Sequence, residues 1–125
     1  MKKKILIIED EQPLLKILAD KFTKEDFEVI LTTNGKDGLD SALKNHPDII
    51  LLDILMPVMD GMMVLNELRK DPWGKNASVI LLTNLSDSEK KKTGFHQGVS
   101  EYLIKSDLSL NDIVKKVKEK LLISK

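Results

Sequence analysis

The sequence predicts a single α/β domain, built from a five-stranded parallel sheet with helices on both faces. Short aliphatic runs alternate along the chain with longer segments in which apolar residues recur at helical spacing, a pattern typical of βαβ units. Four of the aliphatic runs also end directly in a polar or charged residue. Because 125 residues are enough to bury one core and no linker interrupts the pattern, one domain is expected over residues 1–125.

Five strands are expected, at residues 4–9, 27–32, 48–53, 78–83 and 100–104. The first helix opens near Pro13, whose missing N–H costs nothing in a first turn. Its apolar face consists of Leu14, Leu15, Leu18, Ala19 and Phe22. The second helix starts around Gly35 and Gly38 and ends before Pro47.

The later helices differ in the strength of their pattern. Asp60-Gly61 is interpreted as the turn and cap of the third helix, which ends at about Asp71, and is given no chemical role. The fourth helix, at about 87–95, has almost no apolar face, so it should pack thinly on the sheet. The last helix has a clear apolar stripe, made of Leu110, Ile113, Val114, Val117 and Leu121.

Composition narrows the possible partners. Twenty basic residues balance twenty acidic ones, so the net charge favours neither nucleic acid nor a membrane as a partner of this chain. There is no cysteine, which excludes disulfides, thiolate metal sites and cysteine nucleophiles. The basic start Met1–Lys4 precedes an apolar run too short for a signal peptide or a membrane span, so a cytoplasmic location is expected.

The polar strand ends predict a site. We adopt the flavodoxin-like doubly wound order 2-1-3-4-5 from known proteins; the residues alone do not derive it. In that order strands one and three are neighbours, so Glu9 and Asp10 would face Asp53 at the edge where ligands bind. Thr83 and Lys105, which end strands four and five, would lie on the far side of the same pocket.

Phosphoryl transfer onto an aspartate fits these groups. Clustered carboxylates need a cation to stay ionised, and Mg²⁺ suits one or two carboxylates together with water and phosphate oxygens. Asp53 would attack phosphorus in line, Lys105 would offset charge on the phosphoryl oxygens, and Thr83 would donate a hydrogen bond to one of them. The chain lacks the glycine-rich loop and lysine of a P-loop, which argues against ATP as the ligand.

With these residues the chain resembles the receiver (CheY-like) domain of two-component response regulators over essentially its full length. The matching motifs are Glu9-Asp10, Leu52-Asp53-Ile-Leu-Met56-Pro57 with Asp60-Gly61, Leu82-Thr83, and Tyr102-Leu-Ile-Lys105. The resemblance implies that Asp53 is the phosphoacceptor and that Lys105 contacts the phosphoryl group. It implies that Asp10, Asp53 and the backbone carbonyl of Leu55 ligate Mg²⁺, with Glu9 acting through a metal-bound water. Thr83 would be the switch hydroxyl and Tyr102 the switch aromatic.

The resemblance also implies partners. The phosphoryl donor would be a histidine kinase or a histidine phosphotransfer protein that carries phosphohistidine. A dianion on Asp53 would draw Thr83 toward it and let Tyr102 rotate, which changes the face of helix 4, strand 5 and helix 5 for a downstream protein target. The chain would then be a phosphorelay signalling module, whose only chemistry is its own phosphorylation and dephosphorylation, and not an enzyme on external substrates.

Three residues depart from the family pattern. Glu9 stands where the family more often has aspartate, which should change the water-mediated part of the metal shell. Ser106 stands where a cis-proline is common, so a trans Lys105–Ser106 bond is expected. Asn84 stands where the family prefers a small residue, and we expect it to alter the rate of self-dephosphorylation.

Other functions remain open on the residues alone. An aspartyl-phosphate phosphatase would need a general acid two residues after Asp53, where Leu55 stands. A flavin or nucleotide module would need serine, threonine and glycine where Glu9, Asp10 and Glu11 stand. A receiver-like interaction module that works without phosphorylation is a further alternative. The residues fit a stand-alone receiver and a piece of a longer regulator equally well.

Overall fold

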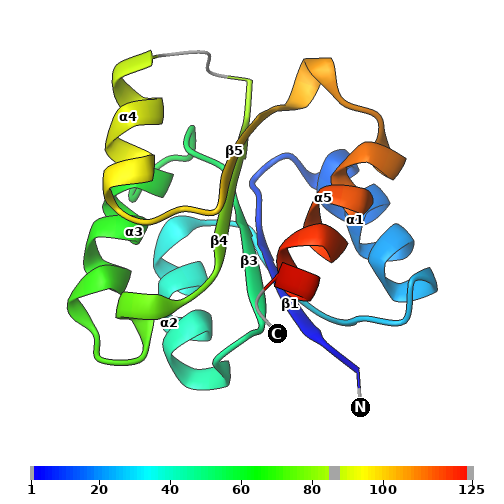
Figure 1. The fold of residues 1–125 in the computed structure, drawn as a ribbon, viewed down its shortest axis with the longest axis horizontal. Coiled ribbons are helices and arrows are strands. Elements are labelled where there is room, and N and C mark those ends of the chain that lie inside the picture. Colours follow the sequence, from blue (N-terminus) through cyan, green and yellow to red (C-terminus); the bar gives the residue numbers. More distant parts are fainter. Residues whose placement is uncertain (1, 85–87, 124–125) are drawn as a thin grey trace.

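The computed structural model describes residues 2–84 and 88–123 and has one parallel sheet at its centre (Figure 1). Its strands are β1 (Lys4–Ile8), β2 (Glu28–Thr32), β3 (Ile49–Leu52), β4 (Val79–Thr83) and β5 (Glu101–Ile104). They pair in the order β2-β1-β3-β4-β5, and every pairing is parallel. The predicted fold class and the adopted strand order are therefore confirmed.

Helices cover both faces of this sheet. They are α1 (Gln12–Lys24), α2 (Gly35–Asn45), α3 (Gly61–Lys70), α4 (Ser88–His96) and α5 (Leu110–Ile123), with short 3-10 turns η1 (Gly74–Asn76) and η2 (Lys105–Asp107). Figure 1 shows α1 and α5 together on one face and α2, α3 and α4 on the other. The expected alternation of strands and helices is observed along the described residues.

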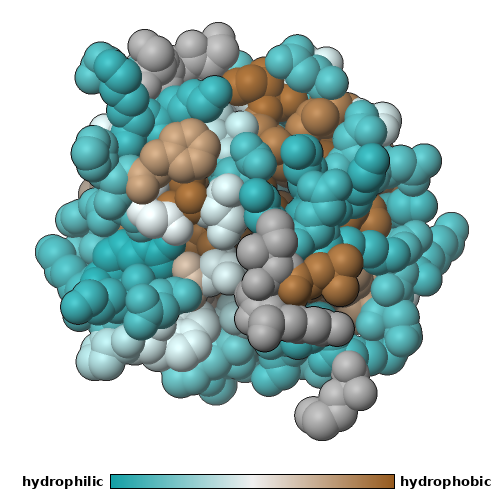
Figure 2. Space-filling model, in the orientation of Figure 1, coloured by the Kyte–Doolittle hydropathy of each residue, from teal (hydrophilic) through white to brown (hydrophobic). Residues whose placement is uncertain are grey.

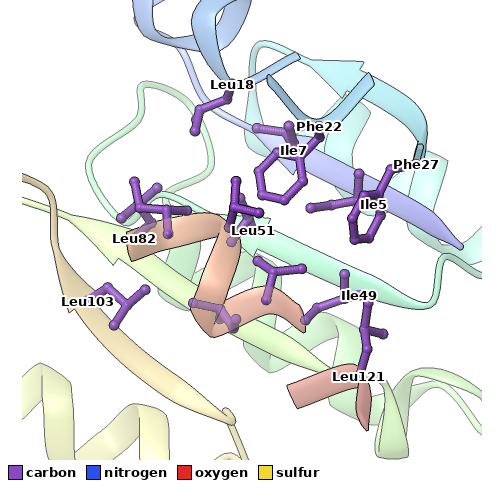
Figure 3. Packing of buried hydrophobic residues seen from close by; sticks show 14 of the residues in the cluster. Ile5, Ile7, Leu18, Phe22, Phe27, Ile49, Leu51, Leu82, Leu103 and Leu121 are labelled. Carbon is purple, nitrogen blue, oxygen red and sulfur yellow. The ribbon is translucent and has the colours of Figure 1, made fainter. Parts of the chain in front are cut away.

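The central strands are buried on both sides, which explains their continuous aliphatic runs. Successive residues point to opposite faces, so Ile7 packs with Phe22 toward α1 and α5, while Leu6 packs with Val64 toward α2 and α3. Figure 3 shows the first of these two clusters in detail. Each fully buried aliphatic side chain contributes about 1.5–3 kcal/mol, so the strands are fixed mainly by this two-sided burial.

Helix α4 is the thinly packed element that the sequence predicts. Among the residues of α4 whose burial is described, only Gly94 is buried, and Phe95 is 45% exposed. A Cβ on Gly94 would lie 2.8 Å from the Cδ1 atom of Leu81, so the helix meets the sheet through close backbone approach. The predicted start at Asp87 lies outside the described residues.

The space-filling view in Figure 2 shows that most of one face of the molecule is hydrophilic, with hydrophobic residues in separate patches.

Helix starts follow two different patterns near the carboxyl edge of the sheet. Asn34 caps α2 by accepting a hydrogen bond from the amide of Asp37 at 2.8 Å, and Asp60 caps α3 by accepting one from Met63 at 3.0 Å. The N-cap residue of α1 is Glu11, and its side chain makes no capping hydrogen bond. The interpretation of Asp60-Gly61 as a cap and turn is confirmed.

Candidate phosphoacceptor site

Two acids follow neighbouring strands at the carboxyl edge of the sheet. Glu9 comes directly after β1 and Asp53 directly after β3, and the last residues of these strands, Ile8 and Leu52, are partners in the register. The two strands end one residue earlier than expected, but the amide of Asp53 still donates to the carbonyl of Ile8 at 3.1 Å. This backbone bond continues the pairing and fixes Asp53 beside β1.

The predicted acidic cluster forms. Glu9, Asp10 and Asp53 each offer a carboxylate oxygen, and these oxygens lie within 4.8 Å of one another. Glu9 is 2% exposed and Asp53 is 4% exposed. Because carboxylate oxygens are hard donors, the cluster suits an oxygen-binding divalent cation such as Mg²⁺.

Lys105 lies among these acids and is itself largely buried. Its Nζ is 2.6 Å from the Oε1 atom of Glu9 and 3.2 Å from the Oδ2 atom of Asp53. A third carboxylate, that of Glu11, is also 3.2 Å from Nζ. One ammonium therefore offsets part of the negative charge that four acids bring to this edge of the sheet.

Burial perturbs the ionisation of Glu9 most. Burial and, to a smaller extent, the charge of Asp53 outweigh the hydrogen bonds from Lys105 and the Glu11 amide and raise the pKa of Glu9 to about 7. Burial acts to lower the pKa of Lys105, but the hydrogen bond to Glu9 and the charges of Asp53 and Glu9 outweigh it and raise that pKa. Lys105 therefore stays charged, whereas Glu9 is only partly ionised near neutral pH.

Asp53 is held through both of its carboxylate oxygens. Oδ2 accepts from Lys105, and Oδ1 accepts from the amide of Leu55 at 3.3 Å. Leu55 is 55% exposed, and Asp53, although only 4% exposed, lines a small pocket at this edge of the sheet. A fixed and accessible oxygen is what a nucleophile in an in-line displacement requires.

A small pocket opens over Asp53. Its volume is about 130 Å³, and it is lined by Asp10, Glu11, Asp53, Leu55, Thr83, Asn84 and Lys105. A water molecule takes up roughly 30 Å³ in the liquid, so the pocket has room for a few waters or for a group of phosphoryl size. Thr83 ends β4 in a fully buried position, and Asn84 is exposed beside it.

Tyr102 does not line this pocket. It is 6% exposed and packs in the cluster on the α2 and α3 face, in register with Leu81, while Thr83 is in register with Ile104. The ring therefore lies on the strand next to that of Thr83, farther from the strand ends. The Lys105–Ser106 bond is trans, as expected, because no described residue has a cis peptide bond.

Two residues near Asp53 were not predicted. Glu11 contacts Lys105 across ninety-four positions of the sequence, which no local pattern reveals. Gly61 packs against the loop that follows β3: a Cβ there would lie 2.2 Å from the backbone carbonyl oxygen of Asp53. The Asp-Gly pair indicated the turn, but its closeness to Asp53 needs the folded chain.

Comparisons with known proteins agree with this geometry. Residues 5–118 match the model of the response regulator receiver domain. A probable transcriptional regulator, ycf27, from Porphyridium aerugineum is 36% identical over 83% of this chain and 42% of its own length. The chain spans less than half the length of the curated relatives that it matches.

Solved structures are similar over nearly the whole chain. The CheY-like receiver domain protein of Methanospirillum hungatei has a TM-score of 0.90 at 26% identity and is covered over 94% of its length by 97% of this chain. The phosphorylated cyanobacterial phytochrome response regulator RcpA has a TM-score of 0.84 at 27% identity, covering 100% of this chain and 97% of RcpA. No described helix of the present chain is long and apolar enough to cross a membrane.

Proposed function

Because this chain belongs to the response regulator receiver domains of two-component signalling, we propose that Asp53 is its phosphoacceptor. The observation that carries the proposal is the fixed carboxylate of Asp53, which both Lys105 and the Leu55 amide orient beneath an open pocket. An oxygen of Asp53 forms a bond to phosphorus while the bond from phosphorus to the donor nitrogen breaks. The whole chain, residues 1–125, acts as one such domain.

The other residues of the pocket stabilise charge. Lys105 turns from the carboxylates toward an oxygen of the transferred group, and the hydroxyl of Thr83 donates to another. Glu9, Asp10 and Asp53, with the Leu55 carbonyl, would hold Mg²⁺, which when bound supplies positive charge to offset that of the phosphoryl oxygens. The three clustered carboxylates support this assignment, because they would repel one another without a cation.

The phosphoryl donor is a histidine kinase or a histidine phosphotransfer protein that carries phosphohistidine. The relative RcpA is described in its phosphorylated form, which supports phosphorylation as the signal. The signal would then pass to a downstream protein target, and the chain would catalyse no reaction on external substrates. A cytoplasmic location, with no nucleic acid or membrane bound by this chain, stays a prediction.

The output would arise from a rearrangement of α4, β5 and α5. A phosphoryl group on Asp53 draws the Thr83 hydroxyl toward it, and Tyr102, now buried, moves into the vacated space. The absence of buried side chains along the described part of α4, apart from Gly94, supports this step, because weakly packed helices move at low cost.

The test is acid-labile phosphate uptake from a small phosphodonor in Mg²⁺, for the native chain and for Asp53→Asn. The native chain should label and the variant should not, because an amide is a poor nucleophile. Equal labelling would remove Asp53 from the mechanism. No labelling of either, with both folded, would favour an interaction module that works without phosphorylation.

A further inference from the structure

Glu11 takes no part in the proposed chemistry, yet its side chain reaches the lysine at the centre of the site. Its Oε1 atom lies 3.2 Å from Nζ of Lys105. The backbone amide of Glu11 also donates to the Oε2 atom of Glu9 at 3.0 Å. This one residue therefore fixes a carboxylate through its main chain and an ammonium through its side chain.

The side chain of Glu11 does not cap the helix that it precedes. Glu11 is the N-cap residue of α1, where a side-chain oxygen commonly accepts a hydrogen bond from an amide of the first turn. Asn34 and Asp60 do this for α2 and α3, whereas the Glu11 side chain makes no such bond. The carboxylate contacts Lys105 instead of capping its own helix.

The three acids around Lys105 are not equivalent. Glu9 and Asp53 are 2% and 4% exposed in their side chains, while the side chain of Glu11 is 59% exposed at the mouth of the pocket. An ammonium has three N–H donors, and here all three can be directed at carboxylates. When a phosphoryl oxygen must be bound, the exposed partner is the one released most easily, because a solvated ion pair is weak.

We propose that the Glu11 carboxylate competes with the incoming phosphoryl group for Lys105 and so slows phosphoryl uptake by Asp53. This inference rests on the proposed function, since it concerns the same site. Glu11 is a positioning residue that acts through Lys105. It occupies one N–H donor of Lys105 in the unphosphorylated chain and is displaced when Asp53 is phosphorylated.

The experiment measures the bimolecular rate constant of labelling by a small anionic phosphodonor in Mg²⁺. Glu11→Gln keeps the length of the side chain and removes its charge, and we expect it to label about threefold faster than the native chain at low ionic strength. Glu28→Gln is the matched control, because Glu28 is exposed at the opposite end of the sheet, at the start of β2. It should label at the native rate.

Two further readouts separate this role from a structural one. Raising the ionic strength screens an exposed pair, so the ratio of the Glu11→Gln rate to the native rate should fall toward one. In a Lys105→Gln background, which labels slowly, adding Glu11→Gln should have no effect, because the residue through which Glu11 acts is gone. If Lys105→Gln does not fold, the salt series on the single variants still separates an electrostatic role of Glu11 from a structural one.

The outcomes are distinguishable. If the native chain does not label, the proposed function fails. If the native chain labels and Glu11→Gln labels at the same rate or more slowly, or if Glu28→Gln gives the same acceleration, the inference about Glu11 fails alone. A threefold effect that persists in the Lys105→Gln background would also overturn it, because Glu11 would then act directly on the donor.

Discussion

Lys105 and Arg69 are largely withdrawn from solvent at opposite ends of the sheet, and they are satisfied in different ways. Lys105 follows β5 and contacts three carboxylates. Arg69, near the end of α3, forms no ion pair with a described acid and donates only to backbone carbonyls. Its acceptors are those of Gly74, Ala77, Gln97 and Gly98, at 2.6 to 3.2 Å.

The difference separates a reactive cation from a structural one. Carbonyls are neither protonated near neutral pH nor phosphorylated, so the acceptors of Arg69 do not change charge with pH or with phosphorylation. The partners of Lys105 are ionisable, and one of them is the proposed phosphoacceptor. Arg69 therefore ties α3 to the segments that precede β4 and β5, while Lys105 can exchange one partner for another.

The largest expected effect is on Arg69. Arg69→Met should lower the free energy of unfolding by about 4 kcal/mol, because several carbonyls lose a charged donor at once. The loss should be similar at pH 5 and pH 8 and with or without Mg²⁺, measured by urea unfolding. Labelling of the folded fraction should stay at the native rate. A loss that shrinks when Mg²⁺ is added would break the distinction from Lys105.

The next effect concerns pH at the Lys105 end. Because burial raises the pKa of Glu9 from 4.5 to about 7, the folded state holds this proton more tightly than the unfolded state. The contribution of Glu9 to the free energy of unfolding is fully present below pH 4.5. It falls by up to ~3 kcal/mol as the pH rises through about 7. Urea unfolding in a chelating buffer should reveal this slope in the native chain.

Glu9→Gln is the control for that slope, since glutamine does not titrate. The difference between native and variant stability should change between pH 4.5 and 7 and be constant above that window. Parallel pH profiles for the two proteins would show that Glu9 has an ordinary pKa.

The smallest effect compares two glycines, one at each end. A Cβ on Gly61 would lie 2.2 Å from the carbonyl oxygen of Asp53, and a Cβ on Gly74 would lie 2.1 Å from that of Leu68. Substituting alanine at either position should cost about 2 kcal/mol, because a backbone segment must move. Only Gly61→Ala should also slow labelling, by about tenfold or more, since it displaces Asp53.

Gly74→Ala is the matched control for that rate. Thermal unfolding and labelling of both variants, compared at a temperature where each is folded, checks the prediction. Equal labelling rates would mean that the Asp53 loop tolerates the shift.

Periodicity predicted the strands and helices, and the strand-end residues together with a strand order adopted from known proteins predicted the meeting of Glu9, Asp53 and Lys105. Strand order carried most of this, since it makes β1 and β3 neighbours and brings their last residues together. The contact between Glu11 and Lys105 and the hydrogen bonds from Arg69 to the segment before β5 were not predicted, because each joins segments far apart in sequence. Arg69 donates to the backbone carbonyl of Gln97. Every residue has such a carbonyl, so the amino-acid sequence does not single out this acceptor.

Tyr102 illustrates a different limit. An aromatic residue in an expected strand is commonly half-buried, and Tyr102 is buried. Whether it moves when Asp53 is phosphorylated depends on the relative free energies of two packings, which a pattern of residue types does not contain.

Helix α4 has a consequence for how this chain can diverge. Since none of its described side chains apart from Gly94 is buried, most substitutions along it leave the core untouched and should be close to neutral for folding. The exposed residues of α4 can therefore be substituted during evolution while the sheet and the acidic residues at its carboxyl edge stay the same. In the proposed output face, substitutions that change binding and substitutions that change stability can therefore fall at different residues.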